Sequence, residues 1–333
     1  MTEAVVQIVP SLPPPAEGVG GYALALEEVL RERAGLPSHL LSARRLPAPT
    51  AEALGAALEE TGARVALLHY AGYGYHPRGC PSWLVRALER WVREGRRLVT
   101  VFHEVWAMGP PWRSSFWLSP FQRRLAGALA RSSAGVVTSL ELYKKNLLGR
   151  APGREVSVLP VFSTVGEPAS VPPLSGRARR LAVFGGPGAR GRAFREVREA
   201  LEATCRELEI EEVCDVGPPL PDRPDRIAGA PVRSLGVLPA AEVSALLLDS
   251  LAGFVAYPAP FLAKSTIFAA YAAHGLLPIS AWHRPRREAE TPPPFWSPGT
   301  RDAPQAVADR ARSWYAGHSL DRHAAVYRRL LAG

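Results

Sequence analysis

The sequence is poor in cysteine and lysine and contains no long apolar run. Its three cysteines, Cys80, Cys205 and Cys214, form neither a CxxC pair nor a metal-ligand spacing, which argues against a disulfide framework or a zinc site. No run of about 18 apolar residues occurs, so no membrane-spanning helix is expected. The N-terminus lacks a basic region followed by an apolar stretch, so we expect no signal peptide and a cytoplasmic protein.

The positive charge comes almost wholly from arginine, because Lys144, Lys145 and Lys264 are the only lysines among 40 basic residues. A net charge of +9 predicts an anionic partner, such as a nucleotide diphosphate or a polyanionic acceptor. It also permits a peripheral contact with the anionic inner face of a membrane. No block of basic residues or zinc pattern occurs, so nucleic acid is not an expected partner.

A single α/β plan occurs twice along the chain. The first half opens with an apolar strand at residues 4–9, a loop containing Gly18, Gly20 and Gly21, and a helix. The second half restarts the pattern with a strand at 180–184, followed by another glycine-rich loop and a helix. For 333 residues, of which 47% are hydrophobic, this repetition predicts two domains, each with its own core.

The boundary between the two domains is predicted from composition. Residues 166–180 are rich in Pro, Gly, Ser and Arg without periodicity, which is typical of a linker. We therefore expect an N-terminal domain over 1–165 and a C-terminal domain over 166–311. A terminal helix at about 312–333 is expected to pack back on the first domain.

An anion site is predicted in the second half, between two apolar strands. Lys264, Ser265 and Thr266 fall where a small-residue helix begins. A helix start gathers free backbone N–H groups, and here two hydroxyls and an ammonium join them. Ligands of open α/β sheets bind at the carboxyl ends of the strands, which is where this helix starts.

Polar and aromatic side chains follow two strands of the first half. His103 and Glu104 come directly after the strand at 97–102, where they could orient hydroxyls or move a proton; a structural histidine is the alternative. The loop at 70–81 combines aromatic faces with hydrogen-bonding tips, which suits a sugar, although a packed surface loop is also compatible. An aromatic segment, residues 106–117, follows His103 and is expected to line a cleft or carry a lid. The candidate acceptor or sugar-lining residues are Tyr73, Tyr75, Arg78 and Trp106.

The order of these elements resembles that of GT-B glycosyltransferases, in particular the bacterial group-1 (GT4-like) branch, over nearly the whole chain. The resemblance implies two Rossmann-like domains facing a central cleft. The stretches that carry the resemblance are Gly18–Gly21, Val101–Glu104, Ser132–Ser139, Phe184–Gly191 and His274–Ile279.

The resemblance implies transfer of a sugar from a nucleotide-sugar donor to an acceptor hydroxyl, with retention at the anomeric carbon, by a hexosyltransferase-like enzyme. The acceptor would be a glycan, a lipid-linked molecule or a small molecule, and no cofactor is needed beyond the donor. Because no Asp-x-Asp occurs, no metal is expected. His103 and Glu104 would serve the reacting sugar. The donor phosphates would meet Gly20, Gly21, Arg190, Lys264, Ser265 and Thr266.

The chain departs from that family at its paired glutamates. Leu262 and Ala270 stand in the corresponding area, and Gly186 falls where a first loop cation is usual. A non-catalytic protein that binds a nucleotide-sugar or a glycan is therefore the alternative. An epimerase of the same fold is a further alternative, whereas the absence of GxGxxG disfavours a dinucleotide oxidoreductase.

Overall fold

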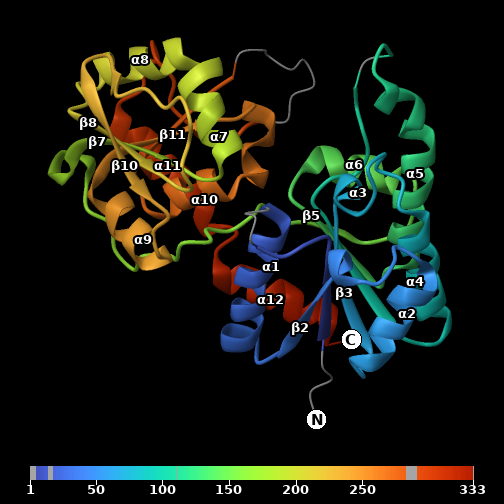
Figure 1. Cartoon of the computed structure of the whole chain (residues 1–333). Helices are drawn as coiled ribbons and strands as arrows, with labels where there is room; N and C mark the ends of the chain where they lie inside the picture. The colour runs from blue at the N-terminus through green and yellow to red at the C-terminus, as the bar shows by residue number, and fades with distance from the viewer. Residues whose placement is uncertain (1–4, 14–17, 110, 283–290, 333) are drawn as a thin grey trace. The chain divides into compact units, whose positions relative to one another are not determined.

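The computed structural model describes residues 5–13, 18–109, 111–282 and 291–332 (Figure 1). The chain divides into two compact units: unit 1 contains Met1–Pro160 and Asp321–Gly333, and unit 2 contains Val161–Leu320. Each unit has one six-stranded sheet with helices, which confirms the predicted α/β class. Residues 14–17 of the first glycine-rich loop and Pro110 of the aromatic segment lie outside the described residues.

The sheet of unit 1 is parallel throughout, with strand order β2-β1-β3-β4-β5-β6. Its central strands are almost continuously apolar, as expected for strands covered by helices on both faces. The strands are β1 (Val5–Val9), β2 (Ser38–Ser42), β3 (Val65–Tyr70), β4 (Arg97–Phe102), β5 (Gly135–Thr138) and β6 (Val156–Val158).

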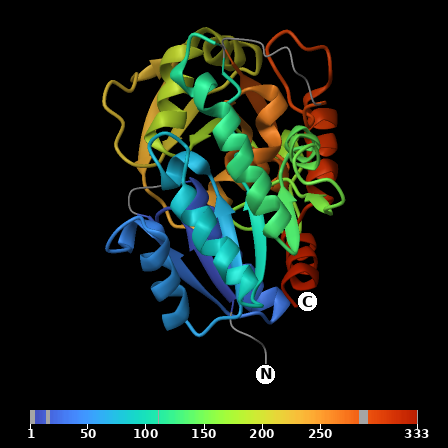
Figure 2. The ribbon, with the colours of Figure 1, turned by 90° about the vertical axis from the view of Figure 1, so that its right-hand side faces the viewer.

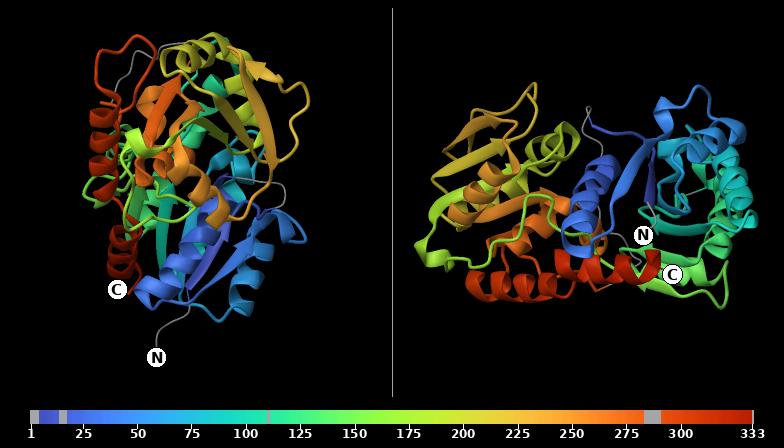
Figure 3. Two further views of the ribbon diagram at one scale, coloured as in Figure 1. Left: turned by 90° about the vertical axis from the view of Figure 1, so that its left-hand side faces the viewer. Right: turned by 90° about the horizontal axis from the view of Figure 1, so that it is seen from below.

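The helices of unit 1 cover both faces of this sheet. Right-handed crossovers place α1 on one face and α2, α4, α5 and α6 on the other. The C-terminal helix α12 lies beside α1, as the right-hand view of Figure 3 shows. The hydroxyl groups of Tyr327 and Tyr22 lie 3.4 Å apart. The helices are α1 (Gly18–Val29), α2 (Ala51–Glu60), α3 (Gly72–Tyr75), α4 (Ser82–Arg93), α5 (Ser114–Ser132), α6 (Glu141–Leu148) and α12 (Leu320–Leu331).

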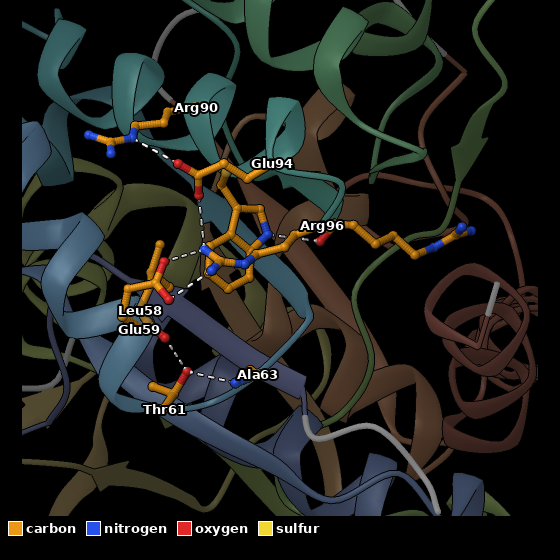
Figure 4. Close-up of polar contacts among 9 residues, drawn as sticks. Leu58, Glu59, Thr61, Ala63, Arg90, Glu94 and Arg96 are labelled. Carbon is orange, nitrogen blue, oxygen red and sulfur yellow. Dashed lines mark hydrogen bonds and ion pairs between the residues drawn. The ribbon is translucent and has the colours of Figure 1, made fainter.

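An arginine ties α2 to the end of α4 on the outer surface of unit 1 (Figure 4). Arg96 pairs with both carboxylate oxygens of Glu59, donates to Glu94 at 3.2 Å, and stacks over the Trp91 ring at 4.5 Å. These groups line a hollow of about 240 Å³ between the two helices. The arginine is matched by carboxylates from the protein itself, so the hollow is a packing feature of the helix pair.

The sheet of unit 2 has the order β12-β11-β7-β8-β10-β9, in which β9 pairs antiparallel and the other pairs are parallel. The strands are β7 (Ala178–Phe184), β8 (Glu212–Val216), β9 (Arg226–Ile227), β10 (Ala230–Gly236), β11 (Ser250–Ala256) and β12 (Leu277–Ala281). The helices are α7 (Pro187–Gly191), α8 (Arg198–Glu207), α9 (Ala240–Asp249), α10 (Thr266–Ala273) and α11 (Pro304–Ala316).

Two apolar clusters fill the faces of the unit 2 sheet. One contains Phe194, Leu201 and Trp296, and the other contains Phe268, Tyr271 and Leu276 from the region of α10. The sequence segment read as a linker contributes to this unit, because the Arg177 guanidinium donates to the carbonyls of Leu247, Ser250 and His274. Its last residues belong to β7.

The predicted strands lie close to their expected positions, whereas two helix starts differ. Helix α1 begins at Gly18, so the glycines form its first turn rather than a preceding loop. Helix α5 begins at Ser114 and includes half of the aromatic segment; it runs along unit 1 in Figure 2. Helix α6 has Leu140 as its N-cap, and no side chain caps it. Tertiary packing decides these boundaries rather than local propensity.

Candidate functional site

A buried line of polar side chains runs through unit 1 and ends at His103, just beyond the carboxyl end of β4. His103 Nε2 lies 3.1 Å from His69 Nδ1, and His69 Nε2 lies 2.8 Å from Gln7 Oε1. Gln7 in turn donates its amide to Ser38 Oγ at 2.8 Å. The line therefore joins neighbouring strands β2, β1 and β3 to the residue that follows β4.

The hydrogen bonds of this line determine which ring nitrogens of His69 and His103 carry a proton. Because the Gln7 amide nitrogen faces Ser38, its oxygen faces His69 and must accept the Nε2 proton. Complete burial, together with the nearby His103, holds the pKa of His69 well below 6.5, so His69 is neutral at pH 7. Its Nδ1 then accepts the Nε2–H of His103. The geometry thus selects one tautomer and one ring orientation for His103.

Tyr22 of α1 packs against both histidines. Its ring meets His103 edge-on at 5.1 Å between centroids and His69 at 5.9 Å. The Tyr22 hydroxyl lies 3.3 Å from His323 Nδ1, and His323 Nε2 bonds the carbonyl of Pro160 at 2.9 Å. The terminal helix α12 therefore supports Tyr22, the side chain against which His103 packs.

The predicted phosphate glycines lie in the first turn of α1, at the carboxyl edge of the unit 1 sheet. A Cβ on Gly20 would lie 2.3 Å from the Ser11 carbonyl oxygen, so glycine is required there by the chain that follows β1. A Cβ on Gly21 would meet nothing within 4 Å. Close packing therefore explains why residue 20 is glycine. Among the described residues, no contact requires a glycine at position 21.

Gln122 of α5 is hydrogen-bonded to two of the four predicted acceptor residues and to the residue that follows a third. Its amide nitrogen donates to the Tyr73 hydroxyl at 3.1 Å and to the Arg78 carbonyl at 2.9 Å, and its oxygen accepts from Ala107 N at 2.8 Å. Trp106 precedes Ala107, and Arg123 lies over its ring at 5.6 Å. The loop after β3 and the segment after β4 are therefore held together by one buried amide.

The other two predicted residues of unit 1 lie in different surroundings. Tyr75 is buried and donates to the carbonyls of Ile8 and His69, both at 3.0 Å, so its hydroxyl supports the strands beneath the edge. Glu104 is exposed, and its backbone N–H donates to the Tyr70 carbonyl at 3.4 Å, next to the corresponding bond from His103 at 3.0 Å.

In unit 2 the predicted helix start is present at the carboxyl edge of the sheet. Ser265 is the N-cap of α10, and its side chain accepts from Phe268 N at 3.2 Å. Lys264 ends a 3-10 turn directly before it, and Thr266 is the first residue of the helix. Because β7 and β11 are parallel neighbours, the glycine-rich loop after β7 and the chain that leads to α10 lie at the same edge.

Arg190 is buried among protein acceptors. Its side chain is 1% exposed, pairs with the fully buried Asp215 at 2.6 Å, and donates to the carbonyls of Gly185 and Pro218. Gly217 closes this cluster with φ +146, and a Cβ there would lie 2.3 Å from the Gly185 oxygen. A donor phosphate would have to compete with Asp215 for this guanidinium, so phosphate binding by Arg190 stays a prediction.

Apolar side chains occupy the area in which the resemblance would place paired glutamates. Leu262 and Ala270 are both 0% exposed and belong to the core cluster beneath α10. Among the residues that the structure describes, no three His, Cys, Asp or Glu side chains meet in a group that could hold a metal ion.

The residues that position His103 and the loop after β3 were not predicted from the sequence. His69 is the last residue but one of an apolar strand and His103 directly follows another, and strands β3 and β4 pair with His69 opposite Val101. That parity places His69 and His103 on the same face of the sheet, a signal available once the strands are known to be neighbours. No comparable pattern marks Gln7 or Gln122 in the sequence.

Comparisons with known proteins give the fold. No protein-family model matches the sequence, and a search of curated proteins finds no match. Among solved structures, the chain is similar to sucrose-phosphate synthase from Thermosynechococcus elongatus, with 14% identity, 99% of each chain covered and a TM-score of 0.62. A glycosyltransferase from Rickettsia africae matches with 12% identity, 99% coverage of each chain and a TM-score of 0.56.

A third similar structure is MnaA of S. aureus with UDP, at 10% identity and a TM-score of 0.56, covering 100% of this chain and 98% of that one. The likeness spans both units and includes both sheets. The chain therefore has the GT-B fold, the architecture of two Rossmann-like halves found in many nucleotide-sugar glycosyltransferases. At these identities the similarity establishes the fold alone.

Proposed function

We propose that this protein is a glycosyltransferase that moves a sugar from a nucleotide-sugar donor to an acceptor hydroxyl. The observation that carries the proposal is the likeness to glycosyltransferases over nearly the whole of both chains. It is supported by a histidine held in one tautomer at the carboxyl edge of unit 1, where ligands of such sheets bind. A hexosyl donor, retention at the anomeric carbon and independence from metal and cofactor are part of the proposal.

In this proposal, unit 2 binds the nucleoside diphosphate. The leaving diphosphate gains negative charge as the glycosidic bond breaks, and preorganised donors at the start of α10 would stabilise it. Lys264 supplies the charge, while Ser265 and Thr266 supply hydroxyls and backbone N–H groups. The buried Arg190–Asp215 pair shapes the neighbouring loop, and Arg190 reaches the phosphate only by leaving that pair.

Unit 1 provides the sugar and acceptor contacts in the same proposal. His103 contacts the sugar or stabilises positive character near the anomeric carbon, and its Nε2–H is already committed to His69. Glu104 accepts from the acceptor hydroxyl. Tyr73, Arg78 and Trp106 offer aromatic faces and charge for a glycan, a lipid-linked molecule or a small acceptor, whereas Tyr75 acts through the strands that it ties together.

A specific observation favours a second candidate, a protein that binds a nucleotide-sugar or a glycan without turning it over. The two positions that correspond to the family's glutamates are filled by Leu262 and Ala270 in the core, so neither can be replaced by a charged side chain without repacking. In an active transferase, other hydrogen-bond acceptors of the protein would have to replace those carboxylates.

A turnover assay separates the two candidates. UDP-, GDP- and ADP-sugars would be incubated with the full chain, and released nucleoside diphosphate would be measured with and without candidate acceptors. His103→Ala is expected to lower turnover by about 100-fold or more while leaving nucleotide affinity unchanged. His39→Ala, which alters an exposed histidine of β2, is the matched control. Nucleotide binding without turnover in the wild-type protein would support the second candidate.

A further inference from the structure

An exposed aromatic patch lies at the start of α5, formed by Trp112, Phe116, Trp117 and Phe121. Trp112 is 84% exposed and Trp117 is 73% exposed, while the two phenylalanines are 39% and 47% exposed. Large aromatic side chains gathered on one surface of a folded protein mark a contact site, since isolated exposed apolar residues are ordinary but clusters are not.

The patch is not needed to hold α5 in place. The opposite face of the helix packs on unit 1 through buried residues that include Ser119, Gln122 and Leu125. Within the patch, the Trp117 indole N–H donates to the Pro111 carbonyl at 3.1 Å, and the Phe116 and Trp117 rings meet edge-on at 5.5 Å. The indole N–H of Trp117 is thus satisfied locally, and this exposed ring is preorganised.

Between Glu104 and Glu141, the charged residues of the chain are all of one sign. Residues 105–140 contain four arginines, Arg113, Arg123, Arg124 and Arg131, and no lysine, aspartate or glutamate. Arg113 precedes α5 and is exposed, and Arg124 is exposed one turn beyond Phe121. A surface that couples aromatic rings with uncompensated arginines complements an anionic, partly apolar partner.

We propose that the aromatic patch and its arginines dock unit 1 on the anionic surface of a lipid bilayer. Tryptophan favours the headgroup level of a bilayer, where its ring is buried and its polar edge stays satisfied. Arginines beside it would meet lipid phosphates, and each basic residue near an anionic leaflet strengthens binding by about fivefold. Docking is peripheral, because no helix of the described residues is long and apolar enough to cross a membrane.

Docking would also orient unit 1. Helix α5 follows β4, so its first turns lie at the same edge of the sheet as His103. The bilayer would therefore face the edge that carries His103, an arrangement suited to an acceptor embedded in lipid. This last step rests on the proposed function, whereas docking itself requires no nucleotide, donor or acceptor.

The test is co-sedimentation of the full chain with vesicles, without nucleotide. We expect binding to vesicles containing about 30% phosphatidylglycerol to be at least about tenfold stronger than to phosphatidylcholine alone, and to weaken at high salt. Trp112→Ser combined with Trp117→Ser should reduce binding about tenfold or more without altering thermal stability. Arg113→Gln with Arg124→Gln should remove the preference for phosphatidylglycerol. Val237→Ser, at an apolar residue of unit 2 that is 71% exposed, is the matched control.

Three outcomes would overturn the proposal. Wild-type protein that fails to sediment with either vesicle has no bilayer site. Equal binding by wild type and the double tryptophan variant would place the contact elsewhere. A wild-type oligomer that becomes monomeric in the double variant, measured by analytical ultracentrifugation without lipid, would show that a second copy of the chain covers the patch. Because the assay contains no donor, failure of the proposed transferase activity leaves its result unchanged.

Discussion

The carboxyl edges of the two sheets carry different kinds of polar and charged groups. In unit 1 the edge carries titratable and aromatic side chains, and His103 is backed by neutral groups, namely His69 and Gln7. In unit 2 the edge consists of a glycine loop and a capped helix start, and its arginine, Arg190, is neutralised by Asp215 below the surface. The two edges therefore differ in the groups that they offer a ligand: mainly side chains in unit 1, and a helix start with its backbone N–H groups in unit 2.

The largest expected effect tests the buried pair of unit 2. Asp215→Ala leaves the Arg190 guanidinium buried without its carboxylate and should lower the free energy of unfolding of unit 2 by about 3–5 kcal/mol. Hydrogen exchange of peptides from each unit in increasing urea would measure the two halves separately. Asp249→Ala, which breaks the exposed contact with Arg180, is the control and should cost less than about 1 kcal/mol. A similar, small effect for both variants would mean that the buried pair does not organise this edge.

The next effect concerns acid stability. Burial lowers the pKa of His318 in unit 2 from 6.5 to about 4. As pH falls from 6.5 to 4, His318 binds a proton in the unfolded chain but stays neutral in the folded chain. This difference lowers the free energy of unfolding by about 2–3 kcal/mol across that window. The Nε2 of His318 has no hydrogen-bond partner among the described residues, so His318→Phe suits its surroundings.

The readout is the free energy of unfolding of unit 2 at pH 7 and at pH 4. His318→Phe should lose less stability between the two values than the wild type, by about 2–3 kcal/mol. His39→Gln, at an exposed histidine of unit 1, should leave the difference unchanged. An identical loss of stability in wild type and His318→Phe would show that His318 is not the group that titrates.

The histidine line of unit 1 is tested at Gln7, which touches no candidate ligand. Gln7→Leu removes the acceptor for the His69 Nε2 proton, so His69 can change tautomer and turn a donor toward His103. We expect turnover to fall by about 10- to 100-fold through misplacement of His103, with a shifted pH profile and unchanged nucleotide affinity. Two-dimensional NMR with ¹⁵N-labelled histidine would detect the tautomers directly, and an unaltered His103 signal in Gln7→Leu would refute the positioning role.

The smallest effect on stability is expected at Gly21. Because a Cβ there meets no protein atom, Gly21→Ala should be neutral or stabilise α1 by up to about 1 kcal/mol. If the backbone of Gly21 approaches the donor phosphates, the same change should weaken nucleotide binding about tenfold. Gly55→Ala in α2, another helical glycine whose Cβ would meet nothing, is the matched control. Equal nucleotide affinity in both variants would remove Gly21 from the donor contacts.

Much of the fold could be predicted because strand positions depend on local apolar runs. The strand at Gly135–Thr138 and the order of strand, glycine turn and helix in both halves were readable without contacts. The helix starts at Gly18 and Ser114 were not, since glycine, tryptophan and proline at those positions are poor local indicators of a helix and packing overrides them.

Two parts of the candidate site could be located from local sequence. His103 follows β4 directly, and the Lys264–Thr266 helix start is marked by the small-residue helix that it begins. The burial of Arg190 depends on Asp215 in the next strand, and the role of Gln122 depends on two loops meeting around α5. Such pairings join residues far apart in the sequence, and no local pattern reports them.

The proposed transferase function requires unit 2 to bind the nucleoside diphosphate of a sugar donor, and calorimetric titration measures that binding. The full chain would be titrated with UDP, GDP and ADP, and the titration with the nucleotide that binds would be repeated on Lys264→Ala. We expect one nucleotide to bind with a dissociation constant between about 1 μM and 1 mM, and Lys264→Ala to weaken binding about tenfold or more without loss of thermal stability. Absence of binding by all three nucleotides, or equal affinity in Lys264→Ala, would contradict this proposal.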